Sequence, residues 1–380
     1  MTATSPPRSA YLHVPFCRHR CGYCNFAVVA GRDDLIPVYL EALAKELGAL
    51  GEPRPVETLY LGGGTPTHLG NEQLDELLGL ARHWFPPLHG DCHTEWTVEA
   101  NPEDISAETI RALASHGVTR LSLGSQSFDA DKLRRLERGH TAEQIEQAVL
   151  LAHSAEMQAS VDLIFAAPDE SLSAWQEDVR RAISLQPDHV SVYGLTYEKG
   201  TRFWSELNKG FLHEREEDLQ RDMYLLAIDH LTEAGFEHYE VSNFAQAGKR
   251  SRHNESYWTG REYYAAGPGA ARYVDGVRET NHASTTTWLK RVQAGESAVA
   301  LSESLDPEQR ARERLVFGLR RLEGIAHSEF EAATGFSIDD LAGESIRRHI
   351  EVGLLNDDGA RLKLTREGLL VSDALWPELL

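Results

Sequence analysis

The sequence predicts an α/β protein in which helices cover a parallel β-sheet. Short runs rich in β-branched residues alternate with amphipathic segments through the first part of the chain, and six such strand–helix units are present. Hydrophobic content of 41% and charged content of 26% are typical of a globular protein, and no apolar run is long enough to span a bilayer. Six units form either a partial barrel or a doubly wound sheet, and both gather functional residues at the carboxyl ends of the strands.

The six predicted strands follow one another at the spacing of strand–helix units. They are residues 10–14 (AYLHV), 57–62 (ETLYLG), 95–100 (EWTVEA), 118–124 (VTRLSLG), 159–166 (ASVDLIFA) and 189–195 (HVSVYGL). Amphipathic segments such as residues 35–50 lie between them. Two helix starts are predicted from the capping-box spacing, at Thr141 with Gln144 and at Ser173 with Gln176.

The pattern changes twice after the sixth unit, which predicts three parts. Residues 1–235 form the barrel or sheet, and residues 236–305 form an extension with aromatic and glycine-rich segments. A hairpin is expected in the extension, with its tight turn at Asp275-Gly276. Residues 306–380 read as three helices followed by a short strand pair, the order of a winged-helix-like α+β module.

Charge and the amino-terminal segment limit the partners and the compartment. A net charge of -21 repels phosphate backbones and predicts that the chain does not bind nucleic acid. The opening MTATSPPRSAYLHV lacks the apolar core of a secretory signal, so we expect a cytoplasmic protein. A disulfide framework is not expected there, and clustered thiols bind metal or do redox work.

Three cysteines lie within eight residues, directly after the first predicted strand, as Cys17, Cys21 and Cys24. Charged and glycine residues surround them, which is a poor setting for buried apolar thiols. A closed zinc site needs four ligands, and His19 or Cys92 would have to complete it; otherwise Cys92 is structural. An iron-sulfur cluster held by three cysteines leaves one iron open to an outside ligand.

The Cys-x3-Cys-x2-Cys spacing after a first strand resembles the signature of radical S-adenosylmethionine enzymes. The resemblance implies a 4Fe-4S cluster on Cys17, Cys21 and Cys24, with S-adenosylmethionine chelating the fourth iron and losing its sulfonium bond on reduction. It also implies a partial six-unit barrel. Further segments resemble, in order, the oxygen-independent coproporphyrinogen III oxidase branch of that superfamily, namely YLHVPFC, YLGGGTPT, VEANPE, LSLGSQSF and VDLIFAAP.

The resemblance assigns the methionyl end of S-adenosylmethionine to the segment LGGGTPT. Gly63, Gly64 and Thr65 occupy those positions, and glycine lets the backbone approach a ligand closely. A glycine turn that simply ends a strand is the alternative for this segment. Arg138 matches an arginine that approaches the ligand carboxylate, for which a guanidinium is the suited partner.

Other polar residues near strand ends match contacts to the ribose hydroxyls and to the cationic ligand. By resemblance these are Glu99, Gln126 and Asp162, whose carboxylates and amide suit both tasks. Tyr11 and Tyr23 match aromatic contacts near the cluster. Simple packing is the alternative for the two tyrosines.

Two further features bear on the choice within this branch. The oxidases carry another cysteine two residues after the third, whereas a sister group of heme chaperones, known as HemW, carries phenylalanine, as Phe26 does here. The segment HNESYW, residues 253–258, fits the HNxxYW pattern associated with heme binding in that group. His253 and Tyr257 are candidate iron ligands, and Trp258 can lie against the macrocycle. The alternative is an aromatic-rich polar loop that closes the barrel mouth.

The expected function is that of a heme chaperone, which binds heme and transfers it to acceptor hemoproteins on a radical S-adenosylmethionine scaffold. The resemblance implies homodimers, acceptors such as respiratory cytochromes, and peripheral association with the membrane that holds them. The alternative function is an oxygen-independent coproporphyrinogen III dehydrogenase, which oxidatively decarboxylates propionate side chains. A zinc-stabilised binding module without redox chemistry is a third class.

Overall fold

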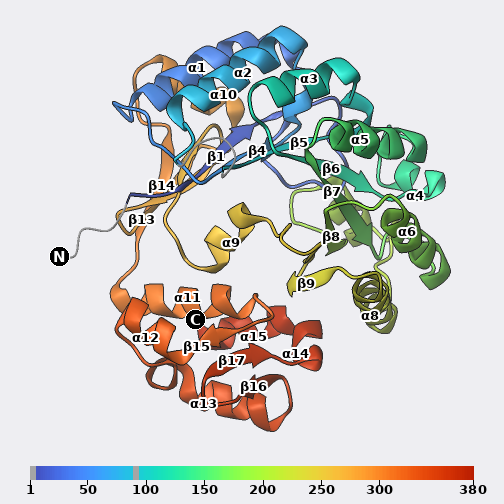
Figure 1. Cartoon of the computed structure of the whole chain (residues 1–380), viewed down its shortest axis with the longest axis vertical. Helices are drawn as coiled ribbons and strands as arrows, with labels where there is room; N and C mark the ends of the chain where they lie inside the picture. Colours follow the sequence, from blue (N-terminus) through green and yellow to red (C-terminus); the bar gives the residue numbers. More distant parts are fainter. Residues whose placement is uncertain (1–5, 89–93) are drawn as a thin grey trace.

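The computed structural model describes residues 6–88 and 94–380, and a nine-stranded sheet forms its centre (Figure 1). All six predicted strands are present, and each pairs in parallel with the next. Each is mostly buried, as expected for strands covered on both faces. They are β1 (Ser9–Val14), β4 (Thr58–Gly63), β5 (Glu95–Ala100), β6 (Arg120–Gln126), β7 (Gln158–Phe165) and β8 (His189–Gly194).

The strand order identifies a partial barrel. The order β11-β1-β4-β5-β6-β7-β8-β10-β9 never reverses along the six units, whereas a doubly wound sheet reverses at a switch point. At one edge β11 (Tyr264–Ala266) pairs in parallel with β1. At the other edge β10 (Asn243–Ala245) pairs antiparallel with β8 and with β9 (Glu237–Glu240). No pairing joins β11 to β9 in the described residues, so the barrel stays open.

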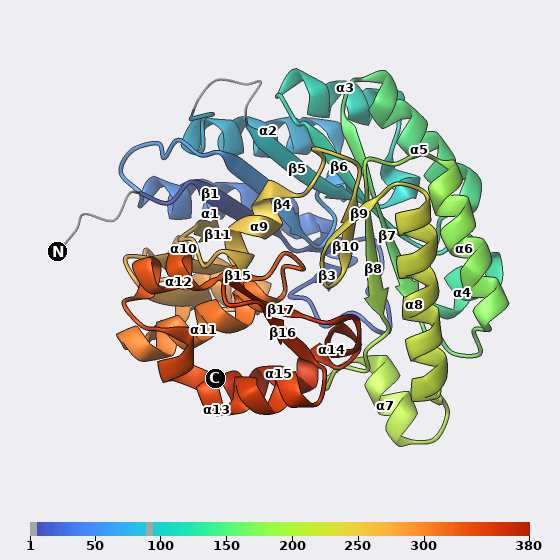
Figure 2. The ribbon, with the colours of Figure 1, turned by 60° about the horizontal axis from the view of Figure 1, so that its bottom comes forward.

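Helices cover the outer side of the sheet, and Figure 2 shows several of them along an arc around the strands. The long helices between strands bury apolar stripes against the sheet in one large core. They are α1 (Ile36–Gly48), α2 (Asn71–Trp84), α3 (Ala107–Ser115), α5 (Ala142–Ser154), α6 (Leu172–Ser184) and α8 (Glu217–Glu233). The shorter elements are α4 (Ala130–Arg135), α7 (Arg202–Asn208) and the 3-10 turns η1 (Asp33–Leu35), η2 (Pro66–His68) and η4 (Pro102–Asp104).

One of the two predicted capping boxes is confirmed. The Thr141 hydroxyl accepts from the Gln144 N–H at the start of α5, and the Gln144 side chain returns to the Thr141 N–H. The prediction that Ser173 begins α6 is wrong, because the Ser171 hydroxyl accepts from the Ala174 N–H at 3.2 Å. Two serines stand two residues apart here, and the earlier one lies in the extended conformation that a cap requires.

The extension contains a second sheet with the predicted hairpin. Strands β12 (Ala271–Val274) and β13 (Val277–Asn281) pair antiparallel around Asp275 and Gly276, whose φ angles of 52° and 73° suit a two-residue hairpin turn. Strand β14 (Val299–Ser304) completes this sheet. Two helices accompany it, α9 (Arg252–Trp258) before the hairpin and α10 (Thr285–Gln293) after it.

The tail forms a smaller α+β module below the barrel in Figure 1. Its elements are α11 (Pro307–Leu319), β15 (Ile325–Ala326), α12 (His327–Thr334), α13 (Ile338–Glu351), β16 (Leu355–Asp357), β17 (Arg361–Leu364), α14 (Arg366–Leu370) and α15 (Ser372–Leu379). The predicted helices and strand pair are present, but β15, α14 and α15 were not predicted. Strand β15 pairs with β17 and makes the sheet three-stranded. None of the helices in the described residues has the length and apolar character needed to cross a bilayer.

Candidate functional site

The cysteine loop leaves the carboxyl end of β1 and is closed at its base by two short strands. Cys17 lies in β2 (Phe16–Cys17), which pairs in parallel with β3 (Val29–Ala30). A turn between them brings the Cys24 N–H to the Cys21 carbonyl at 3.1 Å. All three thiols are free and partly buried. The pairing of β2 with β3 therefore presents three sulfur donors from one short, closed loop.

The surroundings of the thiols suit a cationic group. Burial raises the pKa of Cys17 to about 12 and also raises the pKa of Cys24, and the neighbouring cysteines add to the shift at both. Metals bind the thiolate form, so the loop needs positive charge to hold its cysteines ionised. Arg138 supplies part of it, with Nη1 at 3.6 Å from the Cys21 Sγ atom. An iron-sulfur cluster on these three donors would supply the rest.

A closed zinc site finds no support in the described residues. No group of three or more His, Cys, Asp or Glu side chains there is arranged to hold a single metal ion. His19 lies in the loop, but its Nε2 atom is 3.1 Å from the Glu137 carboxylate. Cys92, interpreted as a structural residue or a fourth zinc ligand, lies outside the described residues. An iron-sulfur cube is larger than one ion and gives each cysteine its own iron.

The glycine segment connects β4 to the cysteine loop. The Gly64 N–H donates to the Val14 carbonyl, and the Thr65 N–H donates to the Phe16 carbonyl, both at 2.8 Å. A Cβ atom at Gly64 would lie 2.6 Å from the Val14 oxygen. The Thr65 Oγ1 atom lies 3.7 Å from the Cys17 sulfur. The segment thus holds the start of the cluster loop in place, beside any role toward a ligand.

Gly63 and Glu99 meet across neighbouring strands. The Gly63 N–H and the Tyr60 hydroxyl donate to the two Glu99 carboxylate oxygens at 2.9 Å and 2.7 Å. Burial raises the pKa of Glu99, and these two hydrogen bonds oppose that shift. Gly63 has φ of +103°, and a Cβ there would lie 2.2 Å from the His13 ring. Only glycine fits this position without displacing the histidine.

Arg138 and Gln126 converge above Gly124 in β6. The Arg138 Nη2 atom donates to the Gly124 carbonyl at 2.7 Å and to the Asn101 side chain. A Cβ at Gly124 would lie 3.1 Å from the Gln126 amide nitrogen and 3.3 Å from the Arg138 guanidinium. The β6–β7 register shifts between Leu123 and Gln126, and Gln126 has φ of +63°. The Gln126 amide and the Arg138 guanidinium therefore both lie beside Gly124.

The remaining expected contacts lie close to this group. Tyr11 in β1 bonds to His13 Nδ1 at 3.0 Å, and its ring centroid is 6.1 Å from that of Tyr60. Tyr23 in the cysteine loop lies edge-on to Phe203, with centroids 6.1 Å apart. Burial raises the pKa of Asp162 in β7 to about 7, with Glu99 adding to the shift and Arg138 opposing it. The charges of Glu99 and Arg138 therefore both act on Asp162.

Sequence reasoning did not select Asn101 and Tyr60. Asn101 donates to the Thr65 Oγ1 atom at 3.0 Å and accepts from Arg138, so it joins the glycine segment to the arginine. Asn101 lies within the motif VEANPE, and that motif could have identified it as a site residue. Nothing in the sequence distinguishes Tyr60, because the alternation of side chains in β4 marks it only as an ordinary strand residue.

Asp162 gives a testable dependence of stability on pH. Because burial raises its pKa to about 7 from 3.8, the folded chain binds a proton that the unfolded chain has released between those values. This contribution to the free energy of unfolding is therefore lost as the pH rises from about 4 to about 7. Asp162→Asn is expected to reduce that loss in urea unfolding followed by circular dichroism. Asp218→Asn in α8, at a side chain 87% exposed, should leave the loss of stability between about pH 4 and pH 7 unchanged. If stability depended on pH in the same way in both variants, the loss could not be assigned to Asp162.

The segment HNESYW forms helix α9 and not a loop. Ser251 caps it by accepting from the Asn254 N–H. His253 is 1% exposed, with Nδ1 at 3.0 Å from the Thr58 hydroxyl and Nε2 at 2.9 Å from the Tyr257 hydroxyl. Burial lowers the pKa of His253 to about 3, so the imidazole is neutral. Thr58 begins β4, so α9 lies at the amino ends of the strands, away from the cysteine loop.

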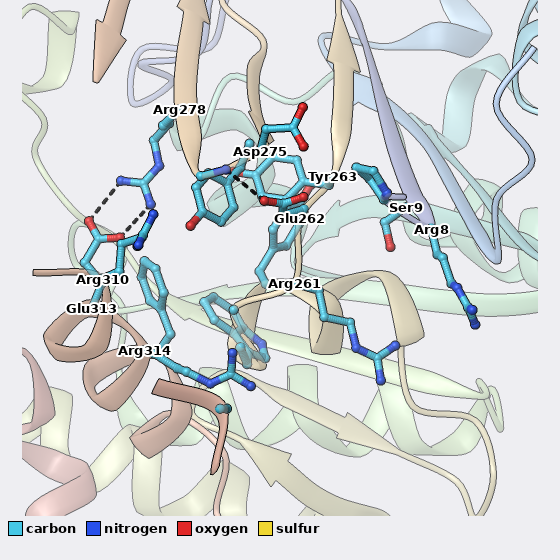
Figure 3. Close-up of a pocket in the computed structure, with 18 of the residues that line it drawn as sticks. Arg8, Ser9, Arg261, Glu262, Tyr263, Asp275, Arg278, Arg310, Glu313 and Arg314 are labelled. Carbon is cyan, nitrogen blue, oxygen red and sulfur yellow. Dashed lines mark hydrogen bonds and ion pairs between the residues drawn. The ribbon is translucent and has the colours of Figure 1, made fainter. Parts of the chain in front are cut away.

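A cavity of about 1340 Å³ lies beside α9, and Tyr257 and Trp258 form part of its wall. Figure 3 shows this cavity between the hairpin and α11. His253 is behind Tyr257 and is not part of the wall. Of the two predicted heme ligands, the structure therefore brings only Tyr257 to a large cavity.

The fold and the cysteine loop place the chain in the radical S-adenosylmethionine class. Residues 11–182 match the model of the Radical SAM superfamily, and residues 305–371 match that of the HemN C-terminal domain. The solved structure of coproporphyrinogen III oxidase (HemN) from Escherichia coli has the same fold, with a TM-score of 0.85 over 98% of this chain and 90% of that one, at 21% identity.

Sequence comparison identifies the family more closely. The chain is 36% identical to the heme chaperone HemW of Lactococcus lactis over 98% of its own length and 97% of that protein. It is 32% identical to the heme chaperone HemW of Bacillus subtilis over 97% of its length and 98% of that protein. The chain therefore belongs to the HemW family, as the resemblance predicted.

Proposed function

We propose that this protein is a heme chaperone that binds heme and transfers it to acceptor hemoproteins. Phe26 carries the proposal. It stands two residues after Cys24, where the oxidases have a further cysteine, and its side chain is 59% exposed at the cluster loop. An aromatic ring at that position offers no donor to iron or substrate. The similarity to proteins named heme chaperones over nearly the full length supports the same function.

The chain is suited to a 4Fe-4S cluster and S-adenosylmethionine as resident cofactors. Cys17, Cys21 and Cys24 would hold the cluster, which when reduced supplies an electron to the sulfonium of the bound ligand. Glu99 and Asp162 would attract the cationic ligand, and Arg138 would approach its carboxylate. Gly63, Gly64 and Thr65 would meet its methionyl end. The remaining expected contacts are Gln126, Tyr11 and Tyr23.

Heme binding is proposed at α9. Tyr257 and Trp258 already face the cavity, whereas iron ligation by His253 requires the imidazole to release Thr58 or Tyr257, because both ring nitrogens are bonded. The burial of His253 therefore predicts that heme binding at this residue is accompanied by local rearrangement of α9.

The function is tested on the anaerobically reconstituted full chain. Heme is titrated in, transfer to an apo-hemoprotein is followed by absorbance, and coproporphyrinogen turnover is assayed in parallel. Heme uptake and transfer without turnover are expected. Robust formation of protoporphyrinogen, or a failure to take up heme, would overturn the chaperone function.

His253→Ala is expected to abolish or strongly weaken heme uptake. It also leaves the buried hydroxyls of Thr58 and Tyr257 without their hydrogen-bond partner. Each unsatisfied hydroxyl reduces the free energy of unfolding by about 1–3 kcal/mol. The matched control is His189→Ala, because His189 is 3% exposed and bridges Ser160 and Tyr239 at 2.8 Å and 2.9 Å in the same manner. Both variants should unfold at lower urea concentration, but only His253→Ala should lose heme. Equal heme affinity in the two would refute a specific role for His253.

The location, the oligomeric state, the acceptors and the division into domains are proposals as well. A cytoplasmic location is one of them. Homodimers, and delivery to respiratory cytochromes through peripheral contact with the membrane, follow from the motif resemblance. The division into residues 1–235, 236–305 and 306–380 follows from the changes in sequence pattern. Because β9, β10 and β11 pair within the barrel sheet, limited proteolysis is expected to cut near residue 305 and not to separate residues 236–305 from the barrel. Light scattering with and without S-adenosylmethionine would measure the oligomeric state.

A further inference from the structure

The cavity beside α9 is large for a small-molecule site. Its volume of about 1340 Å³ exceeds the range of about 300–1,000 Å³ that is usual for ligand pockets. Its walls come from four regions of the chain: the amino-terminal segment up to Ser9 with the nearby Glu57, the end of α9 and the residues after it, the β12–β13 hairpin, and the carboxyl-terminal module through α11 and the end of α12 (Figure 3). A ligand here would contact both the barrel extension and that module.

Aromatic rings form much of the wall. They are Tyr257, Trp258, Tyr263, Tyr273 and Phe317. The Tyr257 and Tyr263 rings meet edge-on at 4.7 Å, and those of Trp258 and Phe317 lie 6.4 Å apart. Large apolar faces with polar tips are the surfaces on which a flat, conjugated ligand lies well.

The arginines of the wall outnumber its carboxylates by one: Arg8, Arg261, Arg278, Arg310 and Arg314 face Glu57, Glu262, Asp275 and Glu313. Arg8 pairs with Glu57 at 2.8 Å, and Arg278 pairs with Glu313 at 2.6 Å. Arg310 and Arg314 have no carboxylate within ion-pair distance in the described residues, and Arg261 reaches Glu57 only at 4.0 Å. In a chain of net charge -21, a cavity wall in which arginines outnumber carboxylates and two arginines lack an ion pair in the described residues is unexpected.

Arg314 also lies close to the Arg261 segment, since its Nη1 atom would be 3.6 Å from a Cβ built at Gly260. Burial, and after it the Arg261 guanidinium, lowers the pKa of Arg314. Figure 3 shows Arg261 and Arg314 in the lower half of the view, one from the segment after α9 and one from α11. Two cations held near each other repel, and an anion between them removes that cost. Guanidinium groups bind carboxylates through paired, charge-assisted hydrogen bonds.

We propose that this cavity binds a planar tetrapyrrole through its carboxylates, with Arg310 and Arg314 as the principal anion partners and Arg261 assisting Arg314. The macrocycle lies against Tyr257 and Trp258. The inference rests on the proposed heme-chaperone function and adds to it the residues that select the propionate groups. It also assigns part of the site to α11, outside the barrel.

The test compares heme with its dimethyl ester, which keeps the macrocycle and iron but lacks both carboxylate charges. Each is titrated into the wild-type chain, an Arg310→Gln/Arg314→Gln double variant, and Arg312→Gln as a matched control. Arg312 lies on the same helix but pairs with Glu308 and is not part of the wall. Thermal unfolding of each variant, followed by circular dichroism, verifies that the fold is retained.

The double variant is expected to bind heme at least about tenfold more weakly and to bind the ester as the wild type does. Arg312→Gln should match the wild type with both ligands. Wild-type heme affinity in a folded double variant would overturn this site and leave the chaperone function standing. Equal weakening for heme and ester would also overturn it, since carboxylates would then not be recognised. If the wild-type chain binds no heme, the proposed function fails and the site with it.

Discussion

Cys21→Ala is expected to remove the iron-sulfur cluster almost completely. Only three thiols are available in the loop, and a cube held by two cysteines exposes two irons to solvent and to loss. The variant also deprives Arg138 of its contact with the Cys21 sulfur. Iron and sulfide analysis with Mössbauer spectroscopy of anaerobically purified protein measures the effect.

Cys92→Ala serves as the control, because Cys92 lies outside the ligand spacing, and it should keep the cluster. A full complement of iron and sulfide in Cys21→Ala, or zinc in its place in the wild type, would contradict the cluster assignment. Heme titration of the same Cys21→Ala protein then separates heme uptake from cluster chemistry.

Gly64→Ala should destabilise the protein by about 1–3 kcal/mol and weaken cluster retention. The new Cβ would lie 2.6 Å from the Val14 oxygen and 2.7 Å from the Phe16 oxygen, both backbone atoms that cannot rotate away. Relief of the clash must move β4 away from the base of the cysteine loop. Urea unfolding and iron content after reconstitution measure the two effects.

Gly79→Ala in α2 is the matched control. A Cβ there finds its nearest neighbour, a His116 ring carbon, at 3.9 Å, which is an ordinary contact. Alanine in a helix interior should stabilise the chain by about 0.5–1 kcal/mol relative to glycine. If Gly64→Ala is as stable as the wild type, the close contact between β4 and the start of the cysteine loop is not needed for folding.

The six barrel strands could be predicted because each is a local pattern. A run such as EWTVEA is buried on both faces and bounded by polar segments, so the sequence itself records its environment. The cysteine loop is equally local, since all three donors lie within eight residues. Strand β15 could not be predicted in the same way, because its two residues depend on pairing with β17, which comes later in the chain.

The environment of His253 could not be predicted from the sequence either, because it too depends on residues that are distant along the chain. Its Nδ1 partner Thr58 is 195 residues away along the chain, and no local pattern marks the pair. The segment HNESYW is visible in the sequence as a motif, but its helical form and the burial of the imidazole are tertiary effects. Likewise, no local pattern marks Arg310 and Arg314 of α11 as lacking an ion pair, because that depends on what folds against the helix.

Strand β1 runs from the cavity to the cysteine loop. Its first residue, Ser9, lies in the cavity wall, and the cysteine loop begins just beyond its last residue, Val14. Six extended residues cover about 20 Å. A tetrapyrrole in this cavity is thus separated from the cysteine loop by most of the depth of the barrel. That is too far for hydrogen abstraction by a radical formed at the loop, because abstraction needs direct contact between the reacting atoms. Cargo stored there would leave chemically unaltered, as a carrier requires.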